Sequence, residues 1–264
     1  MIKFFRQIRK KLLSENKFSK YLLYAIGEIV LVVIGILIAL SINNWNDLRK
    51  DKFKEHVILK QLKEEYAANL EQLDGKIQLR KKIIQSGLIS LSYMDAPKTV
   101  QWDSTIFHLS NTIFDPTFDP IQNDLIISGN IRLIENERLK RLLSNWTSDV
   151  KAVQELELIN QNHVHEVMLP LFNDIGISRD VLSKLWKNMG DSFWLLNQST
   201  DSSNLVIKHA NDKTTPQQIL SNKKLEGVIA NAISYNNICN LESMALRKRI
   251  VEILDLIKIQ LDEQ

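Results

Sequence analysis

A continuous apolar stretch, residues 21–41, constrains this chain more than any other feature. It reads YLLYAIGEIVLVVIGILIALS; thirteen of its residues are Leu, Ile or Val, and Glu28 is its only charged residue. At ~1.5 Å per residue a helix of this length extends ~32 Å, enough to cross a hydrocarbon core of ~30 Å. The aliphatic side chains favour insertion by roughly 5 kcal/mol, and one buried glutamate opposes it by roughly 3 kcal/mol. The stretch therefore predicts a transmembrane helix.

Aromatic residues flank this stretch where the two membrane surfaces would lie. Tyr21 and Tyr24 stand at one end and Trp45 beyond the other, as interfacial anchors do. A cleaved signal peptide is the alternative, because residues 39–41 offer the small residues of a cleavage site. The apolar core of a signal peptide is only ~7–15 residues long, however. We therefore expect an uncleaved anchor.

Basic residues are concentrated before the apolar stretch. Residues 1–20 hold seven Lys or Arg and one Glu, a net charge of +6; since the whole chain carries +3, the remainder carries −3. Four more basic residues follow the stretch within residues 49–54. The bias predicts an N-terminus in the cytoplasm and a body outside the cytoplasmic (inner) membrane. A mildly acidic body also argues against nucleic-acid binding. Residues 124–143 predict a helix, a turn and a second helix, and we therefore interpret them as an ordinary helical corner and not as a DNA-binding motif.

The first twenty residues also predict a basic amphipathic segment. Met1, Phe5, Ile8 and Leu12 follow helical spacing, with basic residues elsewhere on the helix. Such a segment can lie on anionic lipid. The alternative is that its charges only orient the anchor.

One face of the predicted membrane helix combines a carboxyl group with small residues. Its members, at steps of three and four, are Ala25, Glu28, Val32, Gly35 and Ala39. Small residues let a second helix approach closely, and a carboxyl group near the membrane centre needs a partner or a proton. The functional hypothesis is docking on a membrane-protein partner or on a second copy. The alternative is a neutral glutamate tolerated in a plain anchor.

These residues carry a family resemblance. Residues 20–47, KYLLYAIGEIVLVVIGILIALSINNWND, resemble the N-terminal signature of a family of uncharacterised bacterial single-pass membrane proteins, a domain of unknown function found mainly in the Bacteroidota. The chain departs from it at Ser41, where members more often carry Gln, and at Asp47, where they carry Glu. The resemblance implies one membrane span and a mostly helical body, and it implies no activity. It includes Glu28, Asn43, Asn44 and Trp45.

The rest of the chain, residues 42–264, predicts an all-α domain. Glycine and proline together number only 13 residues, which disfavours a β-rich fold. Apolar spacing predicts a helix through Leu59 and Leu88 that ends before Pro97, and a long helix capped by Asn136 that reaches Pro170. Asp103 is predicted to cap a short helix, residues 123–128 and 179–188 to form two more, and Thr215-Pro216 to start a final long helix. We expect the transmembrane helix to continue into an antiparallel bundle with coiled-coil-like packing, outside the cytoplasm.

Catalytic chemistry is not evident in the sequence. His163 and His165 are two residues apart, so on a helix they face different directions and cannot share a metal ion. Glu155, Glu157 and Glu166 define no acid–base pair, and no nucleotide-binding, nucleophile-elbow or zinc-protease motif occurs. We expect Cys239 to be a buried small residue, with an intermolecular disulfide as the alternative. Trp102, Trp146, Trp186 and Trp194 are expected to be core anchors. No metal, cofactor or catalytic residue is predicted.

These features favour a membrane-anchored interaction or scaffold protein that is not an enzyme, with the lipid bilayer and a partner membrane helix as its contacts. A ligand-sensing bundle that signals through a partner is the alternative, since twenty cytoplasmic residues cannot hold an output domain. An enzyme whose site assembles from distant residues is the third reading.

Overall fold

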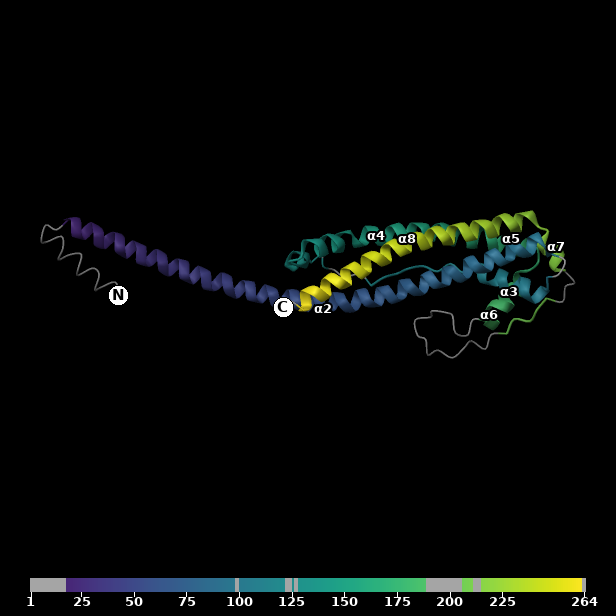
Figure 1. Ribbon diagram of the computed structural model, residues 1–264, viewed down its shortest axis with the longest axis horizontal. Coiled ribbons are helices and arrows are strands. Elements are labelled where there is room, and N and C mark those ends of the chain that lie inside the picture. The colour runs from purple at the N-terminus through teal and green to yellow at the C-terminus, as the bar shows by residue number, and fades with distance from the viewer. Residues whose placement is uncertain are drawn as a thin grey trace. The chain divides into compact units, whose positions relative to one another are not determined.

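The computed structural model describes residues 18–97, 100–121, 125, 128–188, 206–210 and 215–262. Within these residues the regular secondary structure is helical and no strand occurs, which confirms the all-α class. The chain divides into two compact units, residues 1–58 and 59–264. Helix α2, Phe18–Asp95, contributes to both units (Figure 1). The predicted brief helix at residues 123–128, like Trp194, lies largely or wholly outside the described residues.

In the second unit, the distal part of α2 packs with two other long helices, α4 (Glu137–Asn162) and α8 (Lys223–Asp262). Arg247 of α8 binds Asp74 of α2, whereas Ser243 binds Arg80, so residue numbers rise along one helix as they fall along the other. The aromatic rings of Tyr66 and Trp146 lie 4.8 Å apart between α2 and α4. Since Arg80 also reaches Glu157, α2 and α4 run in the same direction.

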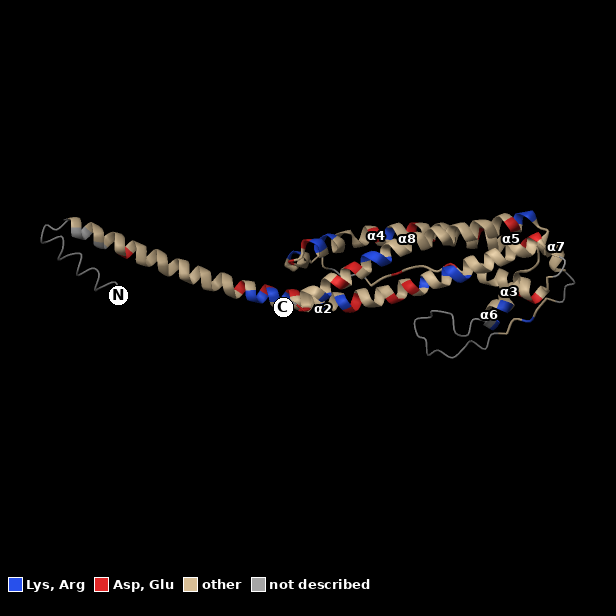
Figure 2. Ribbon diagram, viewed as in Figure 1, with Lys and Arg blue, Asp and Glu red and all other residues tan. Residues whose placement is uncertain are grey.

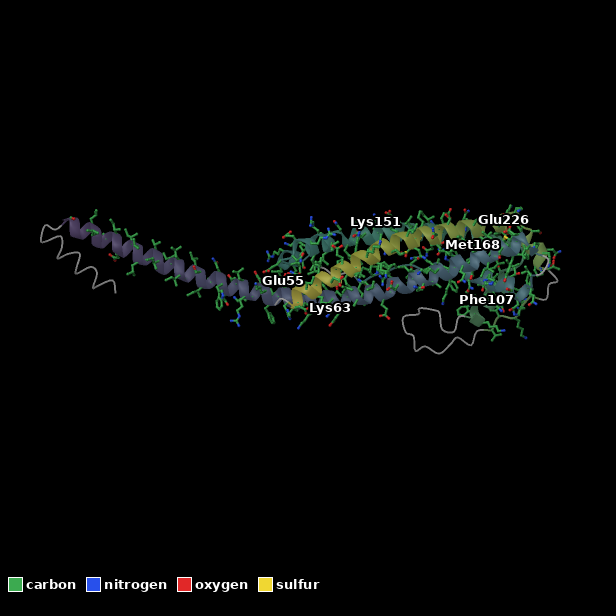
Figure 3. All side chains as sticks on the ribbon, viewed as in Figure 1. Glu55, Lys63, Phe107, Lys151, Met168 and Glu226 are labelled. Atoms are coloured by element: carbon green, nitrogen blue, oxygen red, sulfur yellow. The ribbon has the colours of Figure 1, made fainter. Side chains whose placement is uncertain are left out.

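A heptad pattern explains why these three helices pack together. Buried residues on α8 recur at alternating steps of four and three, which keeps one seam of the helix toward its neighbours. The seam consists of Leu225, Ile229, Ala232, Asn236, Cys239, Ser243, Leu246, Ile250, Ile253 and Ile257. On α2 the same spacing buries Leu59, Leu62, Tyr66, Asn69, Leu73, Arg80 and Ile83. Charged side chains such as Lys63 and Lys151 lie on the outer surface (Figure 3).

The helix predicted through Leu59 and Leu88 is confirmed and ends at Asp95, before Pro97, but Leu88 does not lie on its buried side. Leu88 is 54% exposed, because the buried seam of α2 passes instead through Gly87 and Ser90. Gly87 lets α8 approach closely: a Cβ atom there would lie 2.6 Å from Cγ1 of Ile233.

A second apolar cluster closes one end of the second unit. It is formed by α3 (Trp102–Thr112), α5 (Leu169–Asp174), α6 (Ser178–Asn188), α7 (Pro216–Leu220) and the start of α8. Phe172, Ile177 and Val181 are completely buried in it. The helix predicted at residues 179–188 is thus confirmed, with its start at Ser178.

Several helix ends match the sequence prediction and two differ. The side chain of Asn136 caps α4 by accepting the backbone N–H groups of Arg138 and Leu139, as expected. The predicted cap at Asp103 is wrong, because the N-cap position of α3 is Gln101, so the helix starts at Trp102 and Asp103 lies in its first turn. Thr215 does start a helix, but α7 is only five residues long, and Asn222 then caps α8.

The helix capped by Asn136 continues beyond Pro170. It widens into a π-helical turn, η3, over His163–Met168 and then continues as α5. Because proline has no N–H group and its ring crowds the preceding turn, a widened turn just before Pro170 lets the helix pass it.

Candidate functional site

The first candidate site is the face of α2 formed by Ala25, Glu28, Val32, Gly35 and Ala39, which we call the membrane-helix face. All five residues lie in helix α2, where their spacing places them on one side. No atom of a neighbouring side chain would lie within 4 Å of a Cβ atom at Gly35. Figure 2 shows the stretch as almost uniformly uncharged, with charged residues gathered after it.

This part of α2 is long and apolar enough to cross a membrane, and none of its apolar window is buried within the structure. The exposure separates it from the core helix of a soluble protein, which would be mostly buried. Leu31, Leu37 and Leu40 are each more than half exposed. Trp45 is 64% exposed in the same helix. Tyr21 and Tyr24 also belong to α2, but their side chains lie outside the described residues.

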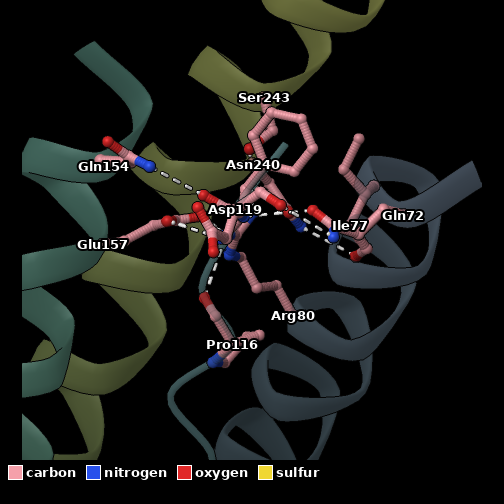
Figure 4. Close-up of polar contacts among 10 residues, drawn as sticks. Gln72, Ile77, Arg80, Pro116, Asp119, Gln154, Glu157, Asn240 and Ser243 are labelled. Atoms are coloured by element: carbon pink, nitrogen blue, oxygen red, sulfur yellow. Dashed lines mark hydrogen bonds and ion pairs between the residues drawn. The ribbon is translucent and has the colours of Figure 1, made fainter. Parts of the chain in front are cut away.

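The second candidate site is a polar layer inside the bundle that was not predicted from the sequence. Arg80 of α2 forms an ion pair with Glu157 of α4 (Figure 4), and the two side chains are only 1% and 2% exposed. Arg80 also donates to Oγ of Ser243 at 2.8 Å and to the carbonyl oxygen of Pro116 at 3.1 Å. Glu157 accepts the backbone N–H of Phe118 at 2.9 Å. This layer therefore joins all three long helices and one connecting segment.

Burial raises the pKa of the Glu157 carboxyl above its ordinary value, and the neighbouring Arg80 guanidinium and the Phe118 N–H oppose that shift. A charge this deep is tolerated when its hydrogen bonds are made and its partner is fixed. The arrangement is typical of a structural ion pair: both groups are enclosed, and their polar atoms are directed at each other and at protein partners.

Further polar residues occupy core positions next to this layer. Asn236 of α8 donates to Asn160 of α4 at 2.9 Å, and Asn240 donates to the carbonyl oxygen of Ile77 at 3.4 Å. Asn160, Asn236 and Ser243 all stand on heptad seam positions. Tracing the heptad along each helix would have placed Arg80 and Glu157 in the core, since each stands seven residues after a buried aliphatic residue: Leu73 before Arg80 and Val150 before Glu157.

The third candidate site holds an extended segment, residues 114–121, which we call the strap. It connects α3 toward α4 and lies against α2 and α4. Its buried residues alternate with exposed ones: Pro116, Phe118 and Pro120 are buried, and Thr117, Asp119 and Ile121 are exposed. This alternation is that of an extended chain with one face on the protein.

Side chains of the helices bind the backbone of the strap. Asn69 donates to the carbonyl oxygen of Ile121 at 3.0 Å and accepts its N–H at 2.8 Å. Gln72 makes the same pair of bonds with Asp119, at 3.0 and 3.1 Å. Gln154 donates to the carbonyl oxygen of Phe118 at 3.0 Å. With Arg80 and Glu157, these residues form what we call the strap-binding residues: Asn69, Gln72, Arg80, Gln154 and Glu157.

The histidines and the cysteine lie apart from one another. Nε2 of His163 is buried 2.9 Å from the carbonyl oxygen of Val228, whereas His165 is exposed beside Asp115 at 2.8 Å. They face different directions, as their spacing predicted. Cys239 is buried as expected, and burial raises the pKa of its thiol to about 11. In the part of the chain that the structure describes, no group of three or more His, Cys, Asp or Glu is placed to hold a metal ion.

Comparison with known proteins gives one family match. Residues 28–101 match the model of a family of unknown function, DUF6090. The match starts at Glu28 and covers residues 28–41 of the apolar stretch and the remainder of α2, and it supports an uncharacterised domain of unknown function. No curated protein and no solved structure matches the chain.

Proposed function

We propose that this chain is a single-pass, membrane-anchored interaction protein without enzymatic activity, which docks on a partner membrane helix through the membrane-helix face. Its N-terminus would lie in the cytoplasm, and its bundle, in which α8 runs antiparallel to α2 and α4, would lie outside the inner membrane. The observation that carries this proposal is a single carboxyl group, Glu28, within an exposed apolar helix, on the same face as Gly35 and Ala39.

The position of Glu28 defines the chemistry of the partner. If residues 21–41 cross the membrane, the carboxyl group stands three residues from the midpoint, ~4.5 Å along the helix axis. An acidic group at that depth favours a basic or hydrogen-bonding group on the facing helix. Gly35 and Ala39 are one helical turn apart and leave the space that close helix packing needs. The proposed partner is therefore a membrane helix with a basic or polar residue at matching depth.

Gentle solubilisation of native membranes, followed by identification of proteins that co-purify with the tagged full-length chain, tests this function. The informative pair of variants is Gly35→Leu, on the membrane-helix face, and Gly27→Leu, which makes the same change about 100° around the helix from Glu28. Neither glycine has a neighbouring atom within 4 Å of a Cβ position, so both changes should leave the chain itself intact.

We expect a specific membrane partner to co-purify with the unaltered chain and with Gly27→Leu, and to be lost with Gly35→Leu and with Glu28→Leu. If all four chains insert, accumulate equally and retain the same partners, or if all emerge alone, docking through this face is wrong.

A separate labelling experiment tests the orientation. The native Cys239 is buried, so a Lys63→Cys chain presents one accessible thiol in the bundle. A membrane-impermeant maleimide added to intact cells with a permeable outer layer should label that chain, and labelling only after lysis would place the bundle in the cytoplasm.

A further inference from the structure

The strap is bound in the manner of a peptide ligand. Every hydrogen bond between the strap-binding residues and the strap reaches a backbone N–H or carbonyl group of the strap. The side chains of Pro116, Phe118 and Pro120, at alternate positions of the strap, are buried. Sites for extended peptides combine the same two elements, which are backbone hydrogen bonds for affinity and pockets for alternate side chains for specificity.

The two prolines of the strap stand at positions whose N–H groups the site does not use. The helices accept N–H groups from Phe118, Asp119 and Ile121, and the hydrogen bonds to Pro116 and Phe118 use carbonyl oxygens. Proline at positions 116 and 120 therefore sacrifices no hydrogen bond of this site, and its fixed φ angle favours the extended chain. A segment of the form Pro-x-Phe-x-Pro matches both the backbone contacts and the buried positions.

We propose that the strap-binding residues form a site for extended peptides, which the chain's own strap occupies in the structure and which a partner protein's extended segment occupies in its place. The partner segment has apolar side chains, proline or aromatic, at alternate positions, and no charge at the buried ones. Charges at the intervening positions are allowed, because Thr117 and Asp119 face outward. This inference does not rest on the docking of Glu28.

The strap competes with any such segment because it is tethered. A tethered ligand acts at an effective concentration of the order of millimolar, so a free peptide with the same contacts binds weakly to the unaltered chain. Weakening the strap without changing the strap-binding residues should expose the site. Phe118→Ala does this, since it removes the largest buried side chain of the strap, which is 1% exposed.

The experiment measures binding of a fluorescent peptide with the sequence of residues 113–122, IFDPTFDPIQ, to the full-length chain in detergent micelles, by fluorescence anisotropy. We expect the Phe118→Ala chain to bind the peptide at least tenfold more tightly than the unaltered chain. If Phe118→Ala does not unfold cooperatively on heating, Phe118→Leu serves as the milder variant.

Two controls distinguish peptide binding at this site from nonspecific hydrophobic binding. Adding Asn69→Ala and Gln72→Ala to the Phe118→Ala chain should reduce peptide affinity at least tenfold, while its helical circular dichroism is retained. A peptide N-methylated at the residues equivalent to Asp119 and Ile121 keeps every side chain but loses the N–H groups that Gln72 and Asn69 accept. Equal affinity for the methylated peptide, or equal binding by the altered and unaltered chains, would overturn the proposal.

Discussion

Arg80 of α2 and Glu157 of α4 form an ion pair that is almost completely enclosed, with side chains 1% and 2% exposed. The guanidinium also reaches Ser243 on α8 and the carbonyl oxygen of Pro116, and the carboxylate also accepts the N–H of Phe118. Four parts of the fold, the three long helices and the strap, are thus joined by two side chains. A purely apolar layer would pack as tightly. The ion pair therefore contributes specificity, because its hydrogen bonds form in only one alignment of the three helices.

The first prediction concerns the removal of one charge. Arg80→Met keeps an unbranched side chain but leaves the Glu157 carboxylate buried without its cation, which costs about 3–5 kcal/mol of unfolding free energy. The Arg80→Met/Glu157→Gln double variant keeps an acceptor for the Phe118 N–H and removes the unpaired charge. We expect it to be more stable than Arg80→Met alone, in chemical denaturation followed by circular dichroism.

The double variant decides the interpretation. If the single and double variants lose the same free energy of unfolding, the pair contributes no more than the packing of its side chains. Its role in fixing the alignment of the three helices would then be wrong.

The sequence predicted the helices well and the core polar residues poorly. Asn136, Pro97 and Thr215 are local signals, since each sets hydrogen bonds within a few residues, and all three mark helix ends in the structure. For Arg80 and Glu157 the heptad gives a core position but not a partner, because the side chains that bind Arg80 stand 77 and 163 residues away in the sequence. A search for regularly spaced apolar residues does not detect a charged residue at a buried heptad position.

The strap shows the same limit. Its two Asp-Pro pairs indicate a turn, but an extended course follows from the topology: α2 and α4 run in the same direction, so their connection must return along the bundle. Asn69 and Gln72, which bind it, look like surface residues in sequence. In the structure Asn69 is 1% exposed.

The second prediction contrasts two glycines in helices. Gly87→Ala places a Cβ atom 2.6 Å from Cγ1 of Ile233 and 3.6 Å from Cγ2 of Ile229. Overpacking of this kind lowers the free energy of unfolding by about 1–3 kcal/mol. This cost exceeds the ~1 kcal/mol by which alanine stabilises a helix relative to glycine. Gly227→Ala meets no atom within 4 Å and should gain most of that ~1 kcal/mol.

Thermal unfolding of the two variants should therefore shift the melting temperature in opposite directions. A stabilised Gly87→Ala chain would mean that α2 and α8 are less closely packed at this point.

The third prediction tests the break between α7 and α8. Asn222 accepts the N–H groups of Lys224 and Leu225 at 2.9 and 3.2 Å, so Asn222→Ala leaves the start of α8 uncapped and should cost about 1 kcal/mol. Asn222→Asp retains the acceptor and should cost much less. If alanine and aspartate behave alike in denaturant titrations, α7 and α8 form one continuous helix in solution, as the sequence first indicated.

The fourth prediction concerns pH. His108 of α3 contacts the rings of Phe107 and Tyr93, at centroid distances of 5.1 and 5.6 Å, and its Nδ1 is buried with no hydrogen-bond partner among the described residues. Burial lowers the pKa of His108 below its ordinary value of 6.5. Between these two pKa values the unfolded chain binds the proton and the folded chain does not, so unfolding is favoured as the pH falls.

The contribution of neutral His108 to stability is therefore complete above pH 6.5 and is lost as the pH falls from there through the lowered pKa. We expect the melting temperature of the unaltered chain to fall between pH 7.5 and 5, and the fall to be smaller in His108→Phe, which keeps an aromatic ring in the same place but cannot be protonated. The other histidines remain in both chains, so their titration cancels in the comparison. Parallel curves of melting temperature against pH for the two chains would show that His108 is equally accessible to protons when folded and unfolded, and that the end of the bundle around α3 is not as closed as its packing indicates.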